Sequence, residues 1–231
     1  MLWRKLSGAG GLVGGIEVVA AFVTNNGNTA TPSIPLTGYG LQADDVIYTS
    51  ISFKNGTDRN ITCTSTGYTE THDAFANDTY DTQMASYYKV ADGTETTLSF
   101  NIVVSGVARI SVVIARGVDT SSPTDGYVAA NKLTNGVALS QPDITTSYNN
   151  SLIILFGSAS GGTVSTAPLT GFTAPTGTEN FNQQGGFSHK HCVATYIAET
   201  SGSQATPDFG GGTTGDVRQS CICITVALKA A

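Results

Sequence analysis

The stretch that most constrains the fold of this chain runs from residue 106 to residue 125. Apolar residues occupy every second position at its start, in the order Ala108, Ile110, Val112 and Ile114. This period of two is typical of a β-strand that packs one face against a core. The strand breaks at Gly117 and enters a corner rich in serine, threonine, aspartate and proline, which favour turns. A strand followed by a long corner predicts the middle of a β-sandwich.

Composition predicts an all-β chain with a single domain. The chain has 231 residues, with 27 glycines and 7 prolines, and only 12% of its residues are charged. Glycine and proline mark turns, and the many threonines favour strands over helices. Sandwiches of this length are commonly single domains. We expect residues 15–231 to form one β-sandwich domain, and we find no internal repeat.

The charge balance argues against nucleic acid as a partner. The formal net charge is −6 and the isoelectric point is about 4.8, whereas nucleic-acid binding draws much of its affinity from lysine and arginine. No apolar run approaches the roughly 20 residues of a membrane helix, so we expect no membrane association. Five glycines between Gly8 and Gly15, and then Glu17, interrupt the apolar core that a signal peptide would need.

Residues 1–14 predict an anchoring arm. They combine the only tryptophan, Trp3, with Arg4, Leu6 and a glycine-rich tether. A flexible backbone can follow another surface, and a tryptophan can bury a large area there. We expect Trp3, Arg4 and Leu6 to anchor the chain in an assembly. The alternative is an arm that folds back on its own domain.

Ten segments have the alternation, or the β-branched and aromatic content, of strands. Residues 79–91 could be read as a helix, but their alternation and their tyrosines favour a strand. We expect the ten to form a two-sheet antiparallel β-sandwich that is jelly-roll-like. They are residues 15–24, 29–35, 41–53, 61–65, 79–91, 95–104, 108–118, 151–158, 189–199 and 217–229.

The longest predicted loop covers residues 161–186. It is rich in glycine, threonine and proline, and it contains Phe172 and Phe181. Binding residues of a β scaffold commonly lie on its loops. We expect these two aromatic residues to lie in an exposed binding loop, with a second displayed loop at residues 203–216.

His189 and His191 are the strongest candidates for a chemical site. Alternate residues of a strand face the same way, so the two imidazoles could hold a metal with a carboxylate or with a histidine of another subunit. Metal sites need about three or four ligands, and only two lie close together here. The hypothesis that we favour is two exposed histidines on an outer face, without a metal.

Other polar groups have simpler interpretations. His72 and Asp73 could act as acid and base, but a hydrogen-bonded turn in a loop is favoured. Asp44 and Asp45 could ligate calcium, yet calcium takes about six to eight oxygens. We expect the cysteines to be small buried side chains in a reduced compartment, since no C-x-x-C pair is present. They are Cys63, Cys192, Cys221 and Cys223.

No motif for catalysis is present. The sequence has no Walker A motif, no G-x-S-x-G and no H-E-x-x-H. We predict that the chain is not an enzyme, with no cofactor and no metal. Four tyrosines could form a sugar-binding face, although half-buried packing is favoured for tyrosines in strands. These are Tyr48, Tyr80, Tyr87 and Tyr88.

Three short motifs follow one another along the chain: GYT at residues 67–69, YYKVA at 87–91, and ARGVD with PTD within 115–125. Residues 44–47 (DDVI) precede them, and the 151–156 strand and the terminal ITVALK follow. In this order they are similar to the jelly-roll modules of tailed-bacteriophage virion proteins and of some bacterial surface proteins. The resemblance covers residues 15–158 and 217–231.

The resemblance implies a structural or host-contact subunit of a virion, without catalytic residues. We expect a protein that decorates the head or builds a tail or fibre appendage and contacts other virion proteins. We also expect a homo-oligomer, such as a trimer, that is assembled in the host cytoplasm and resides in the virion. The alternative is a carbohydrate-binding module or adhesin that contacts host surface glycans through aromatic loop residues.

Overall fold

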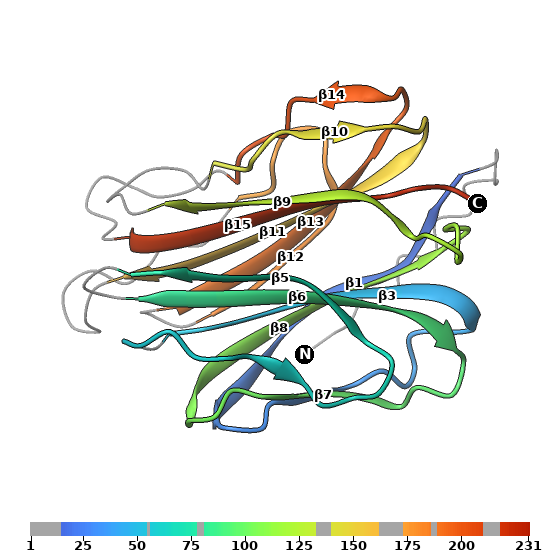
Figure 1. The fold of residues 1–231 in the computed structure, drawn as a ribbon. Coiled ribbons are helices and arrows are strands. Elements are labelled where there is room, and N and C mark those ends of the chain that lie inside the picture. Colours follow the sequence, from blue (N-terminus) through green and yellow to red (C-terminus); the bar gives the residue numbers. More distant parts are fainter. Residues whose placement is uncertain are drawn as a thin grey trace.

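The computed structural model describes residues 15–54, 56–77, 81–132, 140–161, 173–185, 189–209 and 218–231. Within these ranges the chain forms fifteen β-strands and no helix (Figure 1). Two five-stranded antiparallel sheets pack face to face, which confirms the predicted all-β sandwich. The described residues accordingly contain no helix that could cross a membrane.

The first half of the chain builds one five-stranded sheet. Its strand order is β1-β8-β3-β6-β5, and all neighbours are antiparallel. The alternating segment at residues 108–114 lies in β8, which pairs with β1 on one side and with β3 on the other. The strands are β1 (Glu17–Thr29), β3 (Ala43–Phe53), β5 (Thr69–Ala76), β6 (Thr82–Asp92) and β8 (Gly106–Arg116).

The second half builds the other five-stranded sheet. Its order is β12-β13-β11-β15-β9, again antiparallel throughout. The strands are β9 (Thr124–Lys132), β11 (Ser151–Gly161), β12 (Glu179–Gly185), β13 (His189–Ala198) and β15 (Arg218–Leu228). Strand β12 lies within the segment 161–186 that was predicted to be a loop, so that prediction was wrong for residues 179–185.

Two small sheets cover the outer faces of the sandwich. The first consists of β2 (Ser33–Pro35), β7 (Thr97–Asn101) and β4 (Thr62–Cys63), in the order β2-β7-β4. The second consists of β10 (Ile144–Thr146) and β14 (Gly202–Gln204). Figure 1 shows β7 below the large sheets and the β10-β14 pair above them.

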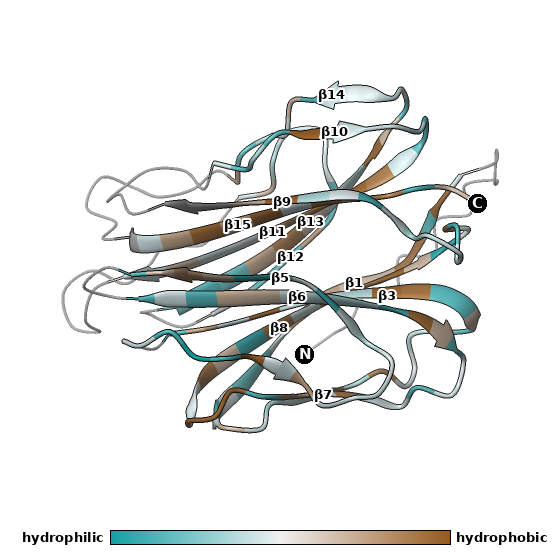
Figure 2. Ribbon diagram, viewed as in Figure 1, coloured by the Kyte–Doolittle hydropathy of each residue, from teal (hydrophilic) through white to brown (hydrophobic). Residues whose placement is uncertain are grey.

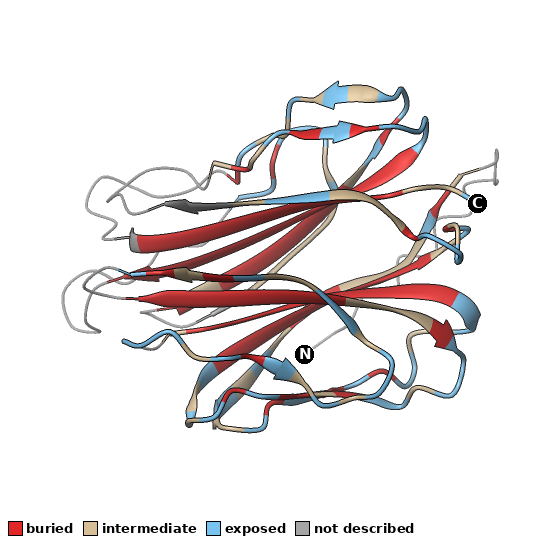
Figure 3. Cartoon of the chain, viewed as in Figure 1, coloured by how far each residue is buried: buried red, intermediate tan, exposed pale blue. Residues whose placement is uncertain are grey.

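The four layers enclose three hydrophobic cores. Tyr48 and Phe156 lie in the central core between the large sheets. Ile47 and Phe100 lie under the first cover, and Phe209 lies under the second. Adjacent residues of one strand therefore point into different cores, as Ile47 and Tyr48 do. This explains why β3, β8 and β11 are buried on both faces (Figure 3) and why apolar residues run through the central strands (Figure 2).

The two halves of the chain repeat one strand order. If the strands of each large sheet are lettered a to e in chain order, both sheets read a-e-b-d-c. The covers repeat as well, because β2 and β10 follow strand a, and β7 and β14 follow strand d. The fold thus contains a repeat that the sequence analysis does not find.

The chain completes the first large sheet before it begins the second. The jelly-roll-like description therefore holds for two packed antiparallel sheets, whereas the strands do not alternate between the sheets along the chain. Both edges of the sandwich have the same construction. Strand β1 contacts β12 at one edge and β5 contacts β9 at the other, which are equivalent pairs in the a-to-e lettering.

Candidate functional site

The structure describes one of the five predicted contact residues. Trp3, Arg4, Leu6 and Phe172 lie outside the described residues. Phe181 lies on strand β12, half-buried, and its ring centroid is 6.1 Å from that of Phe209. Phe181 therefore packs against the second outer core and does not lie in a loop.

The histidine pair is buried, so the prediction of two exposed histidines was wrong. His189 and His191 do face the same way on β13, as the alternation predicts, but they face inward. Their exposed fractions are 2% and 0%. The two rings lie between the large sheets, near the end where β3 and β11 finish.

Ser52 on β3 joins the two rings. Its Oγ lies 3.0 Å from Nε2 of His189 and 2.9 Å from Nδ1 of His191. Ser52 belongs to the first large sheet and the histidines to the second, so these hydrogen bonds cross the interior of the sandwich. A buried polar group is tolerated only when such partners are present.

Hydroxyl groups also hold the two remaining ring nitrogens. Nδ1 of His189 lies 3.0 Å from Oγ of Ser160 on β11, and Nε2 of His191 lies 2.8 Å from Oγ of Ser111 on β8. All four ring nitrogens therefore have a partner. We call Ser52, Ser111, Ser160, His189 and His191 the histidine cluster, and the end of the sandwich that holds it the histidine end.

The contacts at the two ends of the cluster are used to assign a direction to its hydrogen bonds. Thr82 on β6 donates to Ser160 at 2.6 Å, and Ser111 donates to the carbonyl of Ser50 at 3.3 Å. Each hydroxyl has one proton, and each neutral imidazole has one donor and one acceptor nitrogen. The assignment that follows has both rings protonated at Nε2 and accepting at Nδ1. Every group in the cluster is satisfied when both rings are neutral.

A buried arginine lies beside the cluster. Arg109 on β8 is 3% exposed and pairs across the strands with Ser52. It donates to Oδ1 of Asn25 at 2.7 Å and to the carbonyl of Ala108, while its Nε has no hydrogen-bond partner. Burial lowers the pKa of the Arg109 guanidinium.

Burial and the nearby guanidinium keep both rings neutral. Burial, followed by the charge of Arg109, lowers the pKa of His191 to about 3. The same two causes, with His191 and Lys54, hold the pKa of His189 well below its ordinary value. Desolvation disfavours the charged imidazolium, and a neighbouring positive charge disfavours it further.

The cluster does not have the form of a known catalytic or metal site. Ser52 and His189 have the spacing of a nucleophile and its base, but Ser52 is fully buried. Among the described residues, no group of three histidines, cysteines or acids could hold a metal. What the arrangement can do is join the two sheets and take up protons.

The other predicted pairs are separated by the fold. His72 and Asp73 lie on strand β5 and not in a loop, so their side chains leave opposite faces. Asp44 is exposed with φ 67°, whereas Asp45 is buried against Arg116. The two aspartates therefore do not share a site.

The tyrosines do not form one sugar-binding face. Tyr48 lies in the central core and Tyr87 in the core under the first cover, on opposite faces of the first sheet. Tyr88 is half-buried and Tyr80 lies outside the described residues. Packing, the favoured interpretation, is confirmed for Tyr48 and Tyr87.

The cysteines are thiols. Cys192, Cys221 and Cys223 are buried in the second outer core, as predicted, and Cys63 is half-buried. Burial raises the pKa of the Cys63 thiol to about 11, which keeps it protonated at neutral pH.

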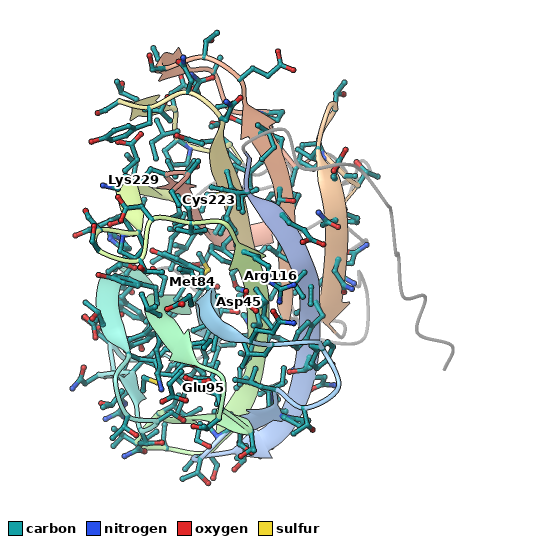
Figure 4. The ribbon with its side chains drawn as sticks, turned by 90° about the vertical axis from the view of Figure 1, so that its right-hand side faces the viewer. Asp45, Met84, Glu95, Arg116, Cys223 and Lys229 are labelled. Atoms are coloured by element: carbon teal, nitrogen blue, oxygen red, sulfur yellow. The ribbon has the colours of Figure 1, made fainter. Side chains whose placement is uncertain are left out.

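Residues of the short motifs described in the sequence analysis lie at the opposite end of the sandwich. Arg116 on β8 forms a bidentate ion pair with buried Asp45 on β3 (Figure 4). Nε of Arg116 lies 2.8 Å from Oδ1 of Asp45, and Nη2 lies 2.9 Å from Oδ2. The backbone N–H of Gln42 also donates to Oδ2 at 2.8 Å. Gly117 then turns the chain with φ 78°, a conformation that favours glycine.

Two further ion pairs hold the same end. Nζ of Lys89 lies 2.8 Å from Oε1 of Glu95, and Nζ of Lys229 lies 2.9 Å from Oδ2 of Asp119. Figure 4 shows Glu95, Arg116 and Lys229 distributed over this end of the molecule. We call it the ion-pair end. Arg116 and Asp45 join β8 to β3. Because Asp45 is buried and binds Arg116 through both of its oxygens, the geometry of this pair is specific.

Sequence reasoning finds the histidines but misses the residues that hold them. A signal was present, because core-facing positions become polar toward one end of three central strands. These positions are Ser50 and Ser52 on β3, Arg109 and Ser111 on β8, and Ser158 and Ser160 on β11. Polar residues at core parity indicate a buried hydrogen-bonded network.

The fold and both ends of the sandwich define a class: an all-β sandwich with two covered sheets. Comparisons with protein-family models, curated proteins and solved structures find no match to this chain.

Proposed function

We propose that the chain is a structural subunit of a tailed-bacteriophage virion. It decorates the head or forms part of a tail or fibre appendage, and it joins its neighbours through residues 1–14. Its partners are other virion proteins and copies of itself, and its place is the mature particle.

One observation carries this proposal. Asp45 and Arg116, which belong to the phage-like motifs, form an ion pair with each other, and Lys89, also a motif residue, pairs with Glu95. The resemblance therefore falls on residues that preserve a shape. Residues that maintain the fold suit a structural subunit, because the function of such a subunit is to keep its shape and to assemble.

The carbohydrate-binding alternative has less support. Two of its four tyrosines are buried in separate cores, and Phe181 packs against Phe209. A glycan array with the intact chain separates the two functions. Reproducible binding that a Tyr148→Ala or Tyr127→Ala substitution removes would favour the alternative, because these two tyrosines are about half exposed.

Removal of residues 1–14 tests the assembly role. We expect the full chain to form oligomers in light scattering, and the truncated chain to be a monomer with the same β-sheet circular dichroism. Trp3→Ala should weaken assembly, whereas Ser7→Ala should not. Unchanged oligomers after truncation, or loss of folding, would contradict the anchoring role.

Purified particles provide the second test. Mass spectrometry of virions from the phage that encodes the chain should detect it at a fixed number of copies per particle. Detection only in the infected cell and never in the particle would contradict the proposal.

A further inference from the structure

We propose that the histidine cluster is an acid-sensitive latch between the two large sheets. Neutral rings hold the sheets together at the histidine end. Proton uptake opens this end, while the ion-pair end stays closed.

The histidine cluster connects the two large sheets. Ser52 and Ser111 come from β3 and β8 of the first sheet, and the two histidines come from β13 of the second. Three hydrogen bonds between these groups, of 2.8 to 3.0 Å, span the interior. Few apolar contacts can replace them, because polar side chains occupy the inner faces of β3, β8 and β11 here.

The protonation state of the two rings decides whether the hydrogen-bonding groups of the cluster are satisfied. In the neutral state each ring donates from Nε2 and accepts at Nδ1, so all four ring nitrogens are hydrogen-bonded. A proton added to either ring turns its accepting nitrogen into a second donor that faces a hydroxyl proton. The hydrogen-bonded chain must then reverse or break. A satisfied buried network is stabilising, whereas a partly satisfied one is not.

The charged groups around the cluster also oppose protonation of the rings. The groups that face the rings from the surrounding elements are Arg109 on β8 and Lys54 after β3, and both are positive. Strands β6, β11 and β15 present the hydroxyl groups of Thr82, Ser160 and Ser220. Asp81 acts on Lys54 and raises its pKa, against the larger effect of burial. An imidazolium here would lie among cations, which is costly in a buried site.

The direction of the pH effect follows from the lowered pKa values. The rings bind protons in the open state below the ordinary pKa of about 6.5, but in the closed state only near pH 3 for His191. The closed state is therefore fully favoured above about pH 6.5 and loses stability as the pH falls. With two rings, the opening equilibrium increases roughly a hundredfold per pH unit in this range.

The ion-pair end responds differently. Hydrogen bonds from Ser121 and Lys229 hold the pKa of Asp119 well below its ordinary value. Burial raises the pKa of Glu95, but the hydrogen bonds from Lys89 and from the backbone of Asp92 outweigh it and lower the pKa. These carboxylates stay ionised at a pH that protonates exposed acids. Opening is thus confined to one end.

Hydrogen exchange of the full chain between pH 7 and pH 4, corrected for intrinsic rates, tests the latch. Protection should fall first in the first half of β13 and the last residues of β3, while the last residues of β8 and β15 stay protected. Loss of protection at both ends at one pH would overturn the proposal. So would unchanged protection of β13 down to the pH of global unfolding.

Histidine variants supply the matched control. His189→Gln and His191→Gln should each remove about one proton from the uptake that accompanies opening. His72→Gln, which changes the third histidine of the chain, should leave opening at the histidine end unchanged. An equal effect of all three would overturn the latch. If the buried variants do not fold, NMR titration of the wild-type rings decides, since ring pKa values near 6.5 in the folded chain would contradict it.

Discussion

At the scale of single residues, the Asp45–Arg116 pair is the clearest test of the ion-pair end. Asp45→Asn removes the charge and one of the two oxygens that Arg116 and Gln42 use. Hydrogen bonds to charged groups contribute about 1.5–3 kcal/mol, and Arg116 is partly exposed. We expect a loss of about 2 kcal/mol in the free energy of unfolding, measured with urea.

The neighbouring aspartate is the control for this experiment. Asp44 is exposed and has φ 67°, which asparagine adopts readily. Asp44→Asn should change stability by less than about 0.5 kcal/mol. Equal losses for the two variants would mean that the buried ion pair does not hold β3 and β8 together.

Glycine positions provide a second residue-scale prediction. Gly93 has φ 85°, and a Cβ there would lie 2.9 Å from the backbone nitrogen of Ala43. Gly38 has φ 88° with nothing within 4 Å of that Cβ position. Gly38→Ala should cost about 1 kcal/mol for the left-handed conformation. Gly93→Ala should cost at least about 1 kcal/mol more, because a backbone atom must also move.

The melting temperatures of the two glycine variants check this prediction. If Gly93→Ala were no less stable than Gly38→Ala, the close approach of the β6–β7 turn to β3 would not be present in solution.

At the scale of elements, the two covers should contribute similarly to stability. Phe100 and Phe209 are fully buried, each against the outer face of one large sheet. Truncation of a buried phenylalanine to alanine costs about 3–5 kcal/mol. We expect Phe100→Ala and Phe209→Ala both to fall in this range in urea unfolding. A cost under about 1 kcal/mol for either would show that its cover is not part of the cooperative fold.

The elements also show what could be predicted from the sequence. Alternation identified β3, β8 and β15 because each has a regular apolar face. The nearly continuous apolar run at residues 151–158 is typical of a strand buried on both faces, and β11 is one. Strand β12 could not be found, because its sequence ENFNQQG is polar and it gains its place by pairing with β13.

The polar part of the candidate site was harder to predict for a related reason. A serine in a strand reads equally well as an exposed or a buried residue. Ser52 and Ser160 are recognised as partners only when residues far apart in the sequence meet at the histidines. The same holds for Arg109, whose burial depends on the second sheet.

At the scale of the whole molecule, the repeated strand order predicts mutual dependence of the two halves. Residues 15–118 and 119–231 each contain one large sheet, and each would expose its face of the central core if it were alone. We expect each half to aggregate or to pair with itself when expressed alone, and the two to form a soluble complex when expressed together. Copurification through a tag on one half measures this.

A stable, monomeric half with cooperative unfolding would contradict that prediction. It would also mean that the central core is an interface between separate domains. The repeat escapes sequence analysis because it is a repeat of strand order, which becomes visible only when the strands are paired.

The contacts of β1 with β12 and of β5 with β9 have a consequence for crowded surroundings. Outer strands that lie against each other offer little opportunity for a neighbour to add a strand of its own. Many copies of the chain can then lie close together without pairing through their outer strands. Contacts between neighbouring copies must then come from segments other than these outer strands.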